Sequence, residues 1–348
     1  MATTFNFTVR AEDDQGAFAD REFSIKVRNT VVDRYMITDS VDAYTSPDLV
    51  NWTKRANQGG YAVNYGGGKW MVTVDLNTAT YRISTDGVNF ETRSLTTSIA
   101  GLTGLAGILV DHEIIWHNGY WWVHCRATSI GWTGYKYFLI KSSDGLTWNT
   151  VAEHNLGQAS STTPTIVGDE MFIVVNSAIY SINTTTGTTS PFSPNLPAMN
   201  LGTGTITILP PYRINGLWIF PRHSITAFGS YYSADRINWY AGEIASSHSG
   251  RTYDRSTYIN GVIFAQYRLT AASSGSGPLM SSDGKKWTTA ATGFSSAINS
   301  GTKCFIFMTK GKVHFILGAG RRTSSDLGET WEEFTLPMAN VTGFAMIR

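Results

Sequence analysis

The sequence predicts an all-β fold built from a repeated unit of four strands, and three observations lead to this prediction. A motif of Ser, any residue, Asp, three or four residues and then Trp or Phe occurs six times, whereas well under about one match is expected by chance. Most units also carry an earlier Gly-rich or Asn-Gly turn followed by aromatic or β-branched residues. Finally, 13% aromatic and only 15% charged residues suit a β-rich protein with a large core.

The recurring motif predicts a β-hairpin. Each copy follows apolar or aromatic residues and ends in an aromatic residue that opens a second alternating segment, which is typical of a hairpin with an Asp-Gly-type turn. We expect the Asp carboxylate to accept hydrogen bonds from backbone N–H groups of its own turn and the aromatic ring to be buried beneath it. These residues are therefore interpreted as structural locks. The six copies centre on Asp48, Asp86, Asp144, Asp235, Asp283 and Asp326.

The spacing of the copies predicts the number of units. The interval between Asp144 and Asp235 is 91 residues, about twice the others. A degenerate copy is expected inside it, at Tyr180–Gly187. The chain then contains seven units of roughly 40 to 55 residues, which is close to the length of a four-stranded propeller blade.

The motif resembles the Asp box, also called the bacterial neuraminidase repeat. The copy from Ser324 to Trp331 fits Ser-x-Asp-x-Gly-x-x-Trp in full, while the other five are one residue shorter and two lack the Gly. This resemblance extends over roughly residues 31 to 348. It implies a β-propeller, here with seven blades.

The two ends of the repeat region predict how the ring closes. The first unit, from about Val31 to Arg55, lacks an inner strand, and the strand-like segment 341–347 has no partner after it. The C-terminal strand is expected to complete the first blade and close the ring, which removes two open sheet edges.

Residues 1–30 differ from the propeller region at 31–348. Segments 5–11 and 21–27 alternate in polarity on either side of Asp13-Asp14-Gln15-Gly16, which predicts a β-hairpin. It resembles the last two strands of the immunoglobulin-like or cadherin-like domains of bacterial surface proteins and phage tail proteins. Two strands alone are marginally stable, so the hairpin is expected to pack on the propeller or a partner, or to end an upstream domain.

Composition narrows the class of protein. A net charge of +1 argues against a nucleic-acid or acidic-membrane partner. No apolar run reaches the length of about 18 residues that a membrane helix requires. The N-terminus lacks the features of a signal peptide, which favours synthesis in the cytoplasm, and Cys125 and Cys304 are expected to be buried free thiols. No motif indicates a cofactor.

Strand polarity separates the loops into two sets. The Asp turns and the Gly turns are expected on one face, and longer, variable loops on the other. Functional residues concentrate on such loops. Exposed aromatic rings beside Arg suit sugars, because the ring stacks on C–H groups and Arg binds hydroxyls or carboxylates; the alternative is that the rings plug the top of the propeller. The candidate ligand-binding residues are Arg126, Trp132, Tyr135, Arg222, His223 and Arg251.

A sialidase is the enzyme that the family resemblance would imply. It would need three arginines on the substrate carboxylate, a Tyr nucleophile with a Glu base, and an Asp acid. Arg222, Arg251 and Arg268 could form the cluster, with Tyr253, Asp254, Asp111 and Glu113 near inner strands. However, the Arg-Ile-Pro signature of the family is absent from the first unit.

The segment Asp111-His112-Glu113, with His117 and His124, has the composition of a metal site. Strand alternation puts residues 111 and 113 on one face and His112 on the other, so they cannot all meet one ion. We expect core or channel residues and no metal.

These observations favour a binding module rather than an enzyme. The neutral propeller behind a surface-protein-like hairpin resembles a phage tail-fibre or tail-tip protein, which would be located in the virion and bind a host-surface glycan or receptor. Other tail proteins would be its partners, and it could be a homo-oligomer. The alternatives are a sialidase-like glycoside hydrolase and a purely structural assembly propeller.

Overall fold

The computed structural model has an almost entirely β structure. Among the described residues, the only helix is the short 3-10 helix η1 (Leu95–Thr97). The all-β prediction is therefore confirmed. The structure describes residues 2–28, 34–97, 99, 105–111, 113–129, 135–154, 164–175, 178–192, 194–197, 207–223, 227–246, 251–269, 273–274, 279–289, 297–298, 304–317, 320–328, 330–338 and 341–347.

Seven antiparallel sheets of four to six strands follow one another along the described chain, and we number them 1 to 7. Sheet 1 contains β3 (Tyr35–Thr38), β4 (Ala43–Ser46), β5 (Thr53–Arg55) and the C-terminal β35 (Gly343–Met346). Sheet 2 contains β6 (Ala62–Gly66), β7 (Lys69–Asp75), β8 (Thr80–Ser84) and β9 (Glu91–Ser94). Sheet 3 contains β10 (Leu105–Val110), β11 (Ile115–His117), β12 (Tyr120–Ser129), β13 (Lys136–Ser142) and β14 (Asn149–His154).

The remaining four sheets complete the series. Sheet 4 contains β15 (Thr165–Val167), β16 (Glu170–Val175), β17 (Ala178–Asn183) and β18 (Thr189–Phe192). Sheet 5 contains β19 (Thr207–Ile208), β20 (Tyr212–Ile214), β21 (Leu217–His223), β22 (Ala227–Ser233), β23 (Tyr240–Ala241) and β24 (Ala245–Ser246). Sheet 6 contains β25 (Arg251–Ile259), β26 (Val262–Leu269), β28 (Leu279–Ser281) and β29 (Thr288–Thr289), and sheet 7 contains β31 (Cys304–Thr309), β32 (Lys312–Leu317), β33 (Gly320–Ser324) and β34 (Glu332–Thr335). Strands β27 (Ser273–Ser274) and β30 (Ala297–Ile298) pair separately.

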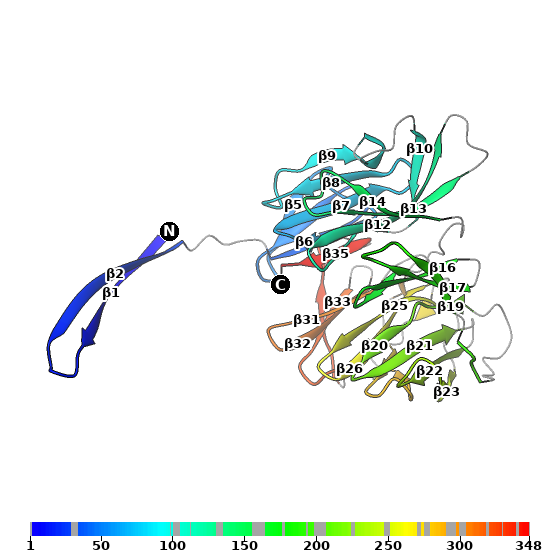
Figure 1. Ribbon diagram of the computed structural model, residues 1–348. Coiled ribbons are helices and arrows are strands. Elements are labelled where there is room, and N and C mark those ends of the chain that lie inside the picture. The colour runs from blue at the N-terminus through cyan, green and yellow to red at the C-terminus, as the bar shows by residue number, and fades with distance from the viewer. Residues whose placement is uncertain are drawn as a thin grey trace.

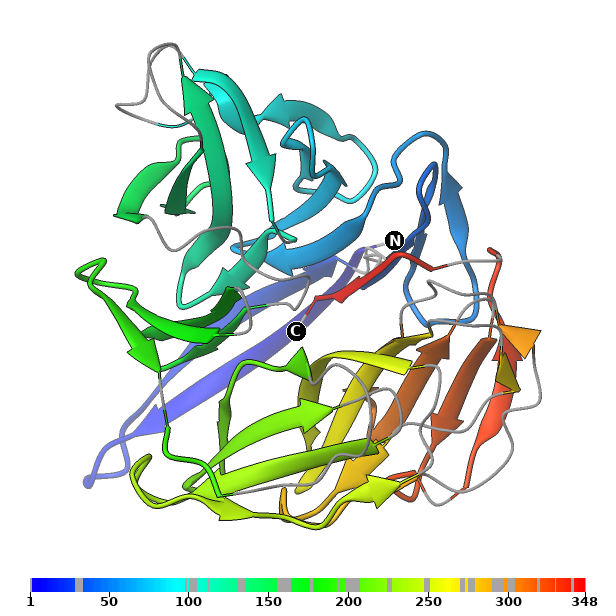
Figure 2. The ribbon, with the colours of Figure 1, turned by 90° about the vertical axis from the view of Figure 1, so that its right-hand side faces the viewer.

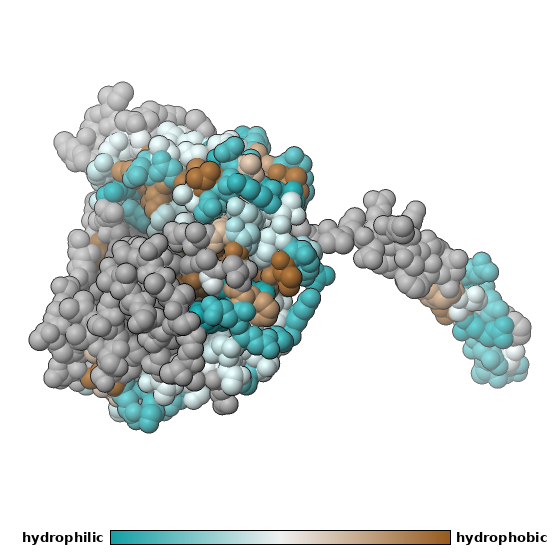
Figure 3. All heavy atoms as spheres, turned by 180° about the vertical axis from the view of Figure 1, so that it is seen from behind, coloured by the Kyte–Doolittle hydropathy of each residue, from teal (hydrophilic) through white to brown (hydrophobic). Residues whose placement is uncertain are grey.

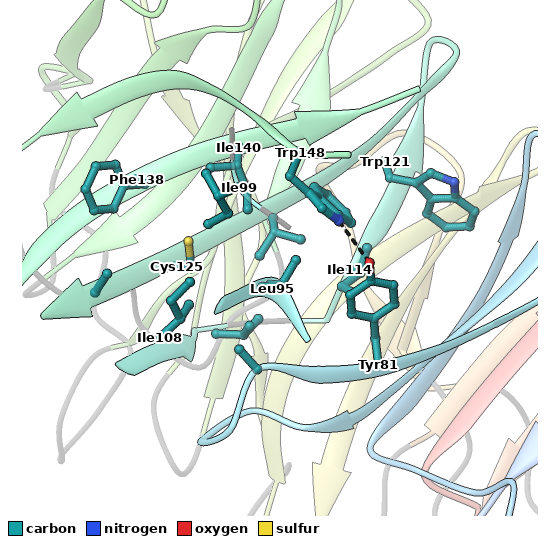
Figure 4. Packing of buried hydrophobic residues seen from close by; sticks show 14 of the residues in the cluster. Tyr81, Leu95, Ile99, Ile108, Ile114, Trp121, Cys125, Phe138, Ile140 and Trp148 are labelled. Atoms are coloured by element: carbon teal, nitrogen blue, oxygen red, sulfur yellow. Dashed lines mark hydrogen bonds between the residues drawn. The ribbon is translucent and has the colours of Figure 1, made fainter. Parts of the chain in front are cut away.

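The sheets are arranged around a common centre, so the predicted β-propeller is confirmed (Figure 2). The core lies between the faces of successive sheets rather than in one central cluster. One such layer joins Met71, Tyr81 and Ile83 of sheet 2 to Trp121 and Phe138 of sheet 3 (Figure 4). Each sheet therefore buries apolar side chains on both faces, which agrees with the high aromatic content.

The Gly turns between the first two strands of a unit have the conformation that their sequences predict. Asn118, Asn215, Asn260 and Lys310 have φ between 45° and 48°, and each is followed by a glycine with φ between 75° and 87°. Two successive positive φ values are characteristic of the type I′ turn, whose twist matches that of a two-stranded hairpin.

All six Asp turns share one hydrogen-bond pattern, in which the Asp carboxylate accepts backbone N–H groups of its own turn as expected. In the turn of sheet 3, Asp144 Oδ1 accepts the backbone N–H groups of Leu146 and Thr147 at 2.8 and 2.9 Å. Ser142 Oγ donates to the same oxygen at 2.9 Å and accepts the N–H of Gly145 at 2.8 Å. The pattern ties three backbone N–H groups of the turn to two side chains that also bond to each other, and equivalent bonds occur around Asp48, Asp86, Asp235, Asp283 and Asp326.

The residue after the Asp lies in the left-handed region of backbone conformation, which explains the glycine of the motif. Gly145 has φ 72°, and a Cβ there would lie 2.7 Å from side-chain atoms of Ile83 and Met71 in sheet 2. Leu49 and Arg236 occupy this position in the two turns that lack Gly, each with φ 67°. A non-glycine residue at such a φ is strained, so its side chain must make compensating contacts.

The degenerate copy expected in the long interval is present in sheet 4. Asn183 replaces the Asp, and its Oδ1 accepts the N–H groups of Thr185 and Thr186 at 2.9 and 2.8 Å. However, Ser181 does not bond to this side chain; its Oγ donates instead to Glu170 Oε1 at 2.7 Å. In this unit the bonds to the Asn183 side chain are therefore formed, whereas the bond from the Ser hydroxyl is not.

The C-terminal strand pairs with the first strand of sheet 1, as predicted. Residues from Tyr35 to Thr38 of β3 pair with Met346 to Gly343 of β35 in antiparallel register. Phe307 of sheet 7 stacks on Phe344 of β35 with ring centroids 3.8 Å apart. Residues that are more than 300 positions apart in sequence thus share one sheet.

The N-terminal segment forms the predicted hairpin from β1 (Ala2–Glu12) and β2 (Phe18–Arg28). Asp13 Oδ1 closes its turn by accepting the N–H groups of Gln15 and Ala17. The hairpin stands apart from the propeller (Figures 1 and 3), so the expected packing on the propeller is not seen. Its two strands hydrogen-bond to each other, and Figure 1 shows no third strand beside them.

Candidate functional site

The topology places the ligand-binding candidates that the structure describes near strand ends on one face of the propeller but on different sheets. Arg126 lies toward the end of β12 and His223 ends β21, while Arg251 begins β25, and all three strand ends lie opposite the Asp turns. Trp132 lies outside the described residues, as do the side chains of His223 and Arg251. Two of the six candidates, Arg126 and Tyr135, are brought together.

Arg126 and Tyr135 form the outer part of a site on sheet 3. The Tyr135 ring is 47% exposed, and the Arg126 guanidinium carbon lies 4.9 Å from the ring centroid. This distance is within the range of a cation–π interaction. Tyr135 and Arg126 therefore form one surface that combines an aromatic ring with a positive charge.

The buried carboxylate of Asp111 forms an ion pair with Arg126. Asp111 Oδ1 lies 3.8 Å from Arg126 Nε, and the Asp111 side chain is only 1% exposed. Its other oxygen, Oδ2, lies 2.8 Å from Nδ1 of His124, which is completely buried. Asp111 therefore connects the surface arginine to an imidazole in the core, since a buried carboxylate needs partners of this kind.

A second imidazole continues the connection. His124 Nε2 lies 3.1 Å from His154 Nε2, and the two rings stack with centroids 5.1 Å apart. The Tyr137 ring stacks on the His154 ring, with the two ring centroids 6.1 Å apart. We call the group of Tyr135, Arg126, Asp111, His124 and His154 the sheet 3 site. Strands β12, β13 and β14 bring its members together, because Arg126 pairs with Tyr137 and Tyr137 pairs with His154.

Burial lowers the pKa of His154 to about 4, and the neighbouring His124 contributes in the same direction. His154 is thus neutral at pH 7, so one proton shared between the two ring nitrogens is enough for their hydrogen bond. The sheet 3 site is a chain of polar groups that runs from a half-exposed tyrosine to a buried neutral histidine.

The structure brings together only some of the acidic and histidine residues near position 111. Asp111 and His124 meet, and His124 is buried in the core. Among the described residues, no three His, Cys, Asp or Glu side chains are grouped so that they could hold a metal ion. His112 lies outside the described residues. His154 is not predicted from the sequence, because strand alternation does not connect it with His124, which lies 30 residues earlier.

The three arginines considered for a sialidase site are not gathered by any described contact. Arg222 Nη1 donates to the Tyr231 hydroxyl of its own sheet at 3.4 Å. Arg251 and Arg268 pair with residues of β26 and β25, and their side chains, with those of Tyr253 and Asp254, are outside the described set. The described residues therefore give no sialidase-type arginine cluster.

Two further findings concern the remaining expectations. Cys125 and Cys304 are buried and form no disulfide, as predicted, and burial together with the charge of Asp111 raises the pKa of the Cys125 thiol. Within the part of the chain that the structure describes, no helix has the length and apolar character needed to span a membrane.

Comparison with known proteins shows the fold and no family. No protein-family model and no curated protein matches the sequence. A protein of unknown function from Desulfotomaculum acetoxidans is similar in structure over 91% of this chain and 99% of its own, with 8% identity and a TM-score of 0.55. A prolyl endopeptidase structure matches 97% of this chain with 9% identity and a TM-score of 0.54.

The chain spans about half the length of that prolyl endopeptidase, of which 50% is covered. Sialidase from Trypanosoma rangeli is also similar over 77% of this chain and 58% of its own, with 12% identity, but a TM-score of 0.41 is too low to support an argument. At these identities the likeness shows a propeller fold, which is shared by proteins of many functions.

Proposed function

We propose that this chain is a carbohydrate-binding propeller whose ligand site lies on the loop face of sheet 3. The observation that carries the proposal is the Arg126–Tyr135 contact, in which a guanidinium lies 4.9 Å from a ring that is 47% exposed. A sugar can place its C–H groups on such a ring while the guanidinium binds a hydroxyl or carboxylate.

The anchoring of Arg126 supports the proposal. Because Asp111 is buried and lies 3.8 Å from Arg126 Nε, the guanidinium is held before any ligand arrives. A group that is already ordered loses less entropy on binding than a free surface arginine. A single site of this size is expected to bind weakly, and display of several copies would raise the apparent affinity.

A glycan array with the purified chain tests the proposal. Tyr135→Ala should abolish binding to the glycans that the wild-type chain retains, while the thermal midpoint stays nearly unchanged because the ring is half exposed. Tyr240→Ala is the matched control, since Tyr240 is 57% exposed on β23, which belongs to sheet 5. Equal loss in both variants, or full binding by Tyr135→Ala, would reject the site. Trp132→Ala is expected to behave like Tyr135→Ala.

We propose a phage tail fibre or tail tip as the setting of this binder, with a host-surface glycan or receptor and other tail proteins as its partners. The support comes from the sequence, in which a hairpin resembling the end of an immunoglobulin-like or cadherin-like domain precedes a neutral propeller. Antibodies raised against the purified chain should label tail ends of virions in electron micrographs. Labelling confined to host cells would contradict this location.

A glycoside hydrolase is the second candidate. The observation that favours it is the connection Asp111–His124–His154, in which consecutive groups are 2.8 and 3.1 Å apart and could pass a proton toward the Arg126 surface. Glycosidases commonly use two carboxyl groups about 5 or 6.5–9.5 Å apart, and the test is release of reducing sugar from candidate glycans. Turnover that Asp111→Asn removes would establish this candidate over simple binding.

We also propose that the propeller has seven blades in a closed ring. Support comes from the seven sheets of four to six strands and from the β3–β35 pairing. Pairing of the two chain ends in one sheet leaves neither terminal strand as an open inner edge, which makes the arrangement a stable platform for loop-borne ligand sites.

A further inference from the structure

A cavity lies between sheet 4 and the Asp turn of sheet 5, on the face opposite the sheet 3 site. Its volume is about 390 Å³, which is within the lower part of the range for small-molecule sites. Strands β17 and β18 supply one wall, and Arg236 of the sheet 5 turn supplies another. No part of the sheet 3 site contributes to its lining.

The walls are rich in hydroxyl and amide groups. Ser181, Asn183, Thr188 and Ser190 line the cavity. Ser181 and Ser190 are direct partners in the β17–β18 ladder, so their hydroxyls lie side by side. Thr188 and Ser190 are exposed, and their hydroxyls can both donate and accept hydrogen bonds. Such a lining matches a ligand that carries several hydroxyls of its own.

The one positive and one negative charge in the cavity neutralise each other. Arg236 Nη1 donates to Glu170 Oε2 at 2.6 Å, and Nη2 donates to Oε1 at 3.4 Å. Both side chains are about one-third exposed, at 31% and 30%. Because the pair has no net charge, the cavity offers little to an ionic ligand and favours an uncharged one.

Aromatic contacts hold the arginine in position. The Arg236 guanidinium carbon lies 4.6 Å from the Trp218 ring centroid and 5.2 Å from that of Phe192. These contacts compensate for the strain of Arg236 at a position where φ is 67° and where three of the other turns have Gly. Phe192 also lines the cavity, and its ring gives the apolar surface on which a sugar can pack.

The turn of sheet 4 that borders the cavity departs from the others. In the six complete turns the Ser hydroxyl donates to the Asp. In sheet 4, Ser181 Oγ donates to Glu170 instead, which leaves the Ser181–Asn183 end of the turn beside the cavity. Both departures from the motif, Asn183 and Arg236, contribute to one site.

We propose that this cavity binds a neutral sugar, the size of a monosaccharide or one end of an oligosaccharide, independently of the sheet 3 site. The hydroxyls of Thr188 and Ser190 hydrogen-bond to the sugar hydroxyls, and Phe192 packs against its C–H face. A monosaccharide bound by this few groups has a Kd on the order of millimolar.

The experiment uses the full chain carrying Tyr135→Ala, so that the sheet 3 site does not contribute. Ligand-observed NMR with glucose, galactose, mannose, arabinose and N-acetylglucosamine should detect at least one bound sugar. Ser190→Ile fills the cavity with a residue that suits a strand, and it should reduce binding of that sugar at least about tenfold. Thr92→Ile is the matched control, because Thr92 is an exposed residue of the outer strand β9 in sheet 2.

A charge change gives a second readout that loss of folding could not produce. Glu170→Gln leaves Arg236 with an unpaired positive charge, so binding should shift from the neutral sugar toward glucuronate. Binding that Ser190→Ile and Thr92→Ile affect equally, no binding of any of the five sugars at about 50 mM, or an unchanged preference in Glu170→Gln would overturn the proposal. Because Tyr135→Ala is present throughout, failure here leaves the sheet 3 proposal untouched.

Discussion

Tyr81 of sheet 2 and Trp148 of sheet 3 are joined by a buried hydrogen bond across two sheets. Trp148 Nε1 donates to the Tyr81 hydroxyl at 3.2 Å (Figure 4), and that hydroxyl donates to the carbonyl oxygen of Gly145 at 2.9 Å. Sheets 5 and 6 repeat this arrangement at Ser230. Its hydroxyl accepts a hydrogen bond from Trp287 Nε1 and donates one to the Gly284 carbonyl oxygen. The Asp turns therefore fix neighbouring sheets to each other as well as their own hairpins.

Removal of the Tyr81 hydroxyl should destabilise the propeller. Tyr81→Phe leaves the indole N–H and a turn carbonyl without their partner in a fully buried place, which costs about 1–3 kcal/mol. Urea denaturation measures the free energy of unfolding. Tyr240→Phe is the control, since its ring is 57% exposed. A loss of similar size in both variants would mean that the cross-sheet bond contributes nothing.

Substitution of Asp144 should separate the hydrogen bonds of the turn from its charge. Asp144→Ala removes the acceptor of two backbone N–H groups and should lower the free energy of unfolding by about 1–3 kcal/mol. Asp144→Asn should lose much less, because Asn183 already accepts the same two bonds in sheet 4. Glycan binding should survive in both variants. A stable Asp144→Ala protein that no longer binds glycan would contradict the structural role of the turn.

Two buried histidines should make the protein less stable as the pH falls from about 6.5 to 4. Burial lowers the pKa of His154 and His314 to about 4, helped by the neighbouring His124 and Arg321 respectively, whereas an unfolded histidine titrates near 6.5. Between these values the unfolded chain binds more protons, so stability present above pH 6.5 is lost on acidification, by up to about 3 kcal/mol for each histidine.

Denaturation by urea at several pH values between 4.5 and 7.5 checks this prediction. His154→Gln should show a shallower loss of unfolding free energy with falling pH than the wild-type chain. The Asp turns act in a different range, because backbone N–H groups, first that of Asn51, lower the pKa of Asp48 to about 2. Their contribution is lost only below the ordinary aspartate pKa near 3.9. Parallel curves for the variant and wild type would show that His154 is not responsible.

Deletion of residues 341–347 should open the propeller. This change removes the partner of β3 and the ring that stacks on Phe307 at 3.8 Å, so it exposes a sheet edge. We expect a sharply lower thermal midpoint, or an insoluble protein. A synthetic peptide of residues 341–347 added in excess should partly restore the midpoint, and an unchanged midpoint after deletion would argue against closure by this strand.

The N-terminal hairpin should not fold by itself. Strands β1 and β2 pair only with each other over eleven positions from Ala2–Arg28 to Glu12–Phe18, and a two-stranded sheet is marginal in water. Circular dichroism of a peptide of residues 1–30 should show a disordered chain. A cooperative melting transition of that peptide would contradict the prediction.

The sequence by itself determined the local structure of this protein. The turn after Ser142 and the turn at Asn118-Gly119 depend on side chains and φ values within a few residues of each other, so their spacing predicted both the turns and the strands between them. The repeat then predicted the propeller, because each four-stranded unit must bury both faces against its neighbours. The interval with Asn183 departed furthest from the motif, because Asn replaces the Asp there.

Only the tertiary structure decided which polar groups meet. His154 joins His124 and Asp111 because β12, β13 and β14 lie side by side in one register, and no local pattern encodes that contact. Arg236 likewise meets Glu170, which lies 66 residues earlier, because the turn of one sheet packs on the strands of the preceding one. Contacts of this kind depend on how sheets are stacked, which is set by packing over the whole ring rather than by neighbours in the sequence.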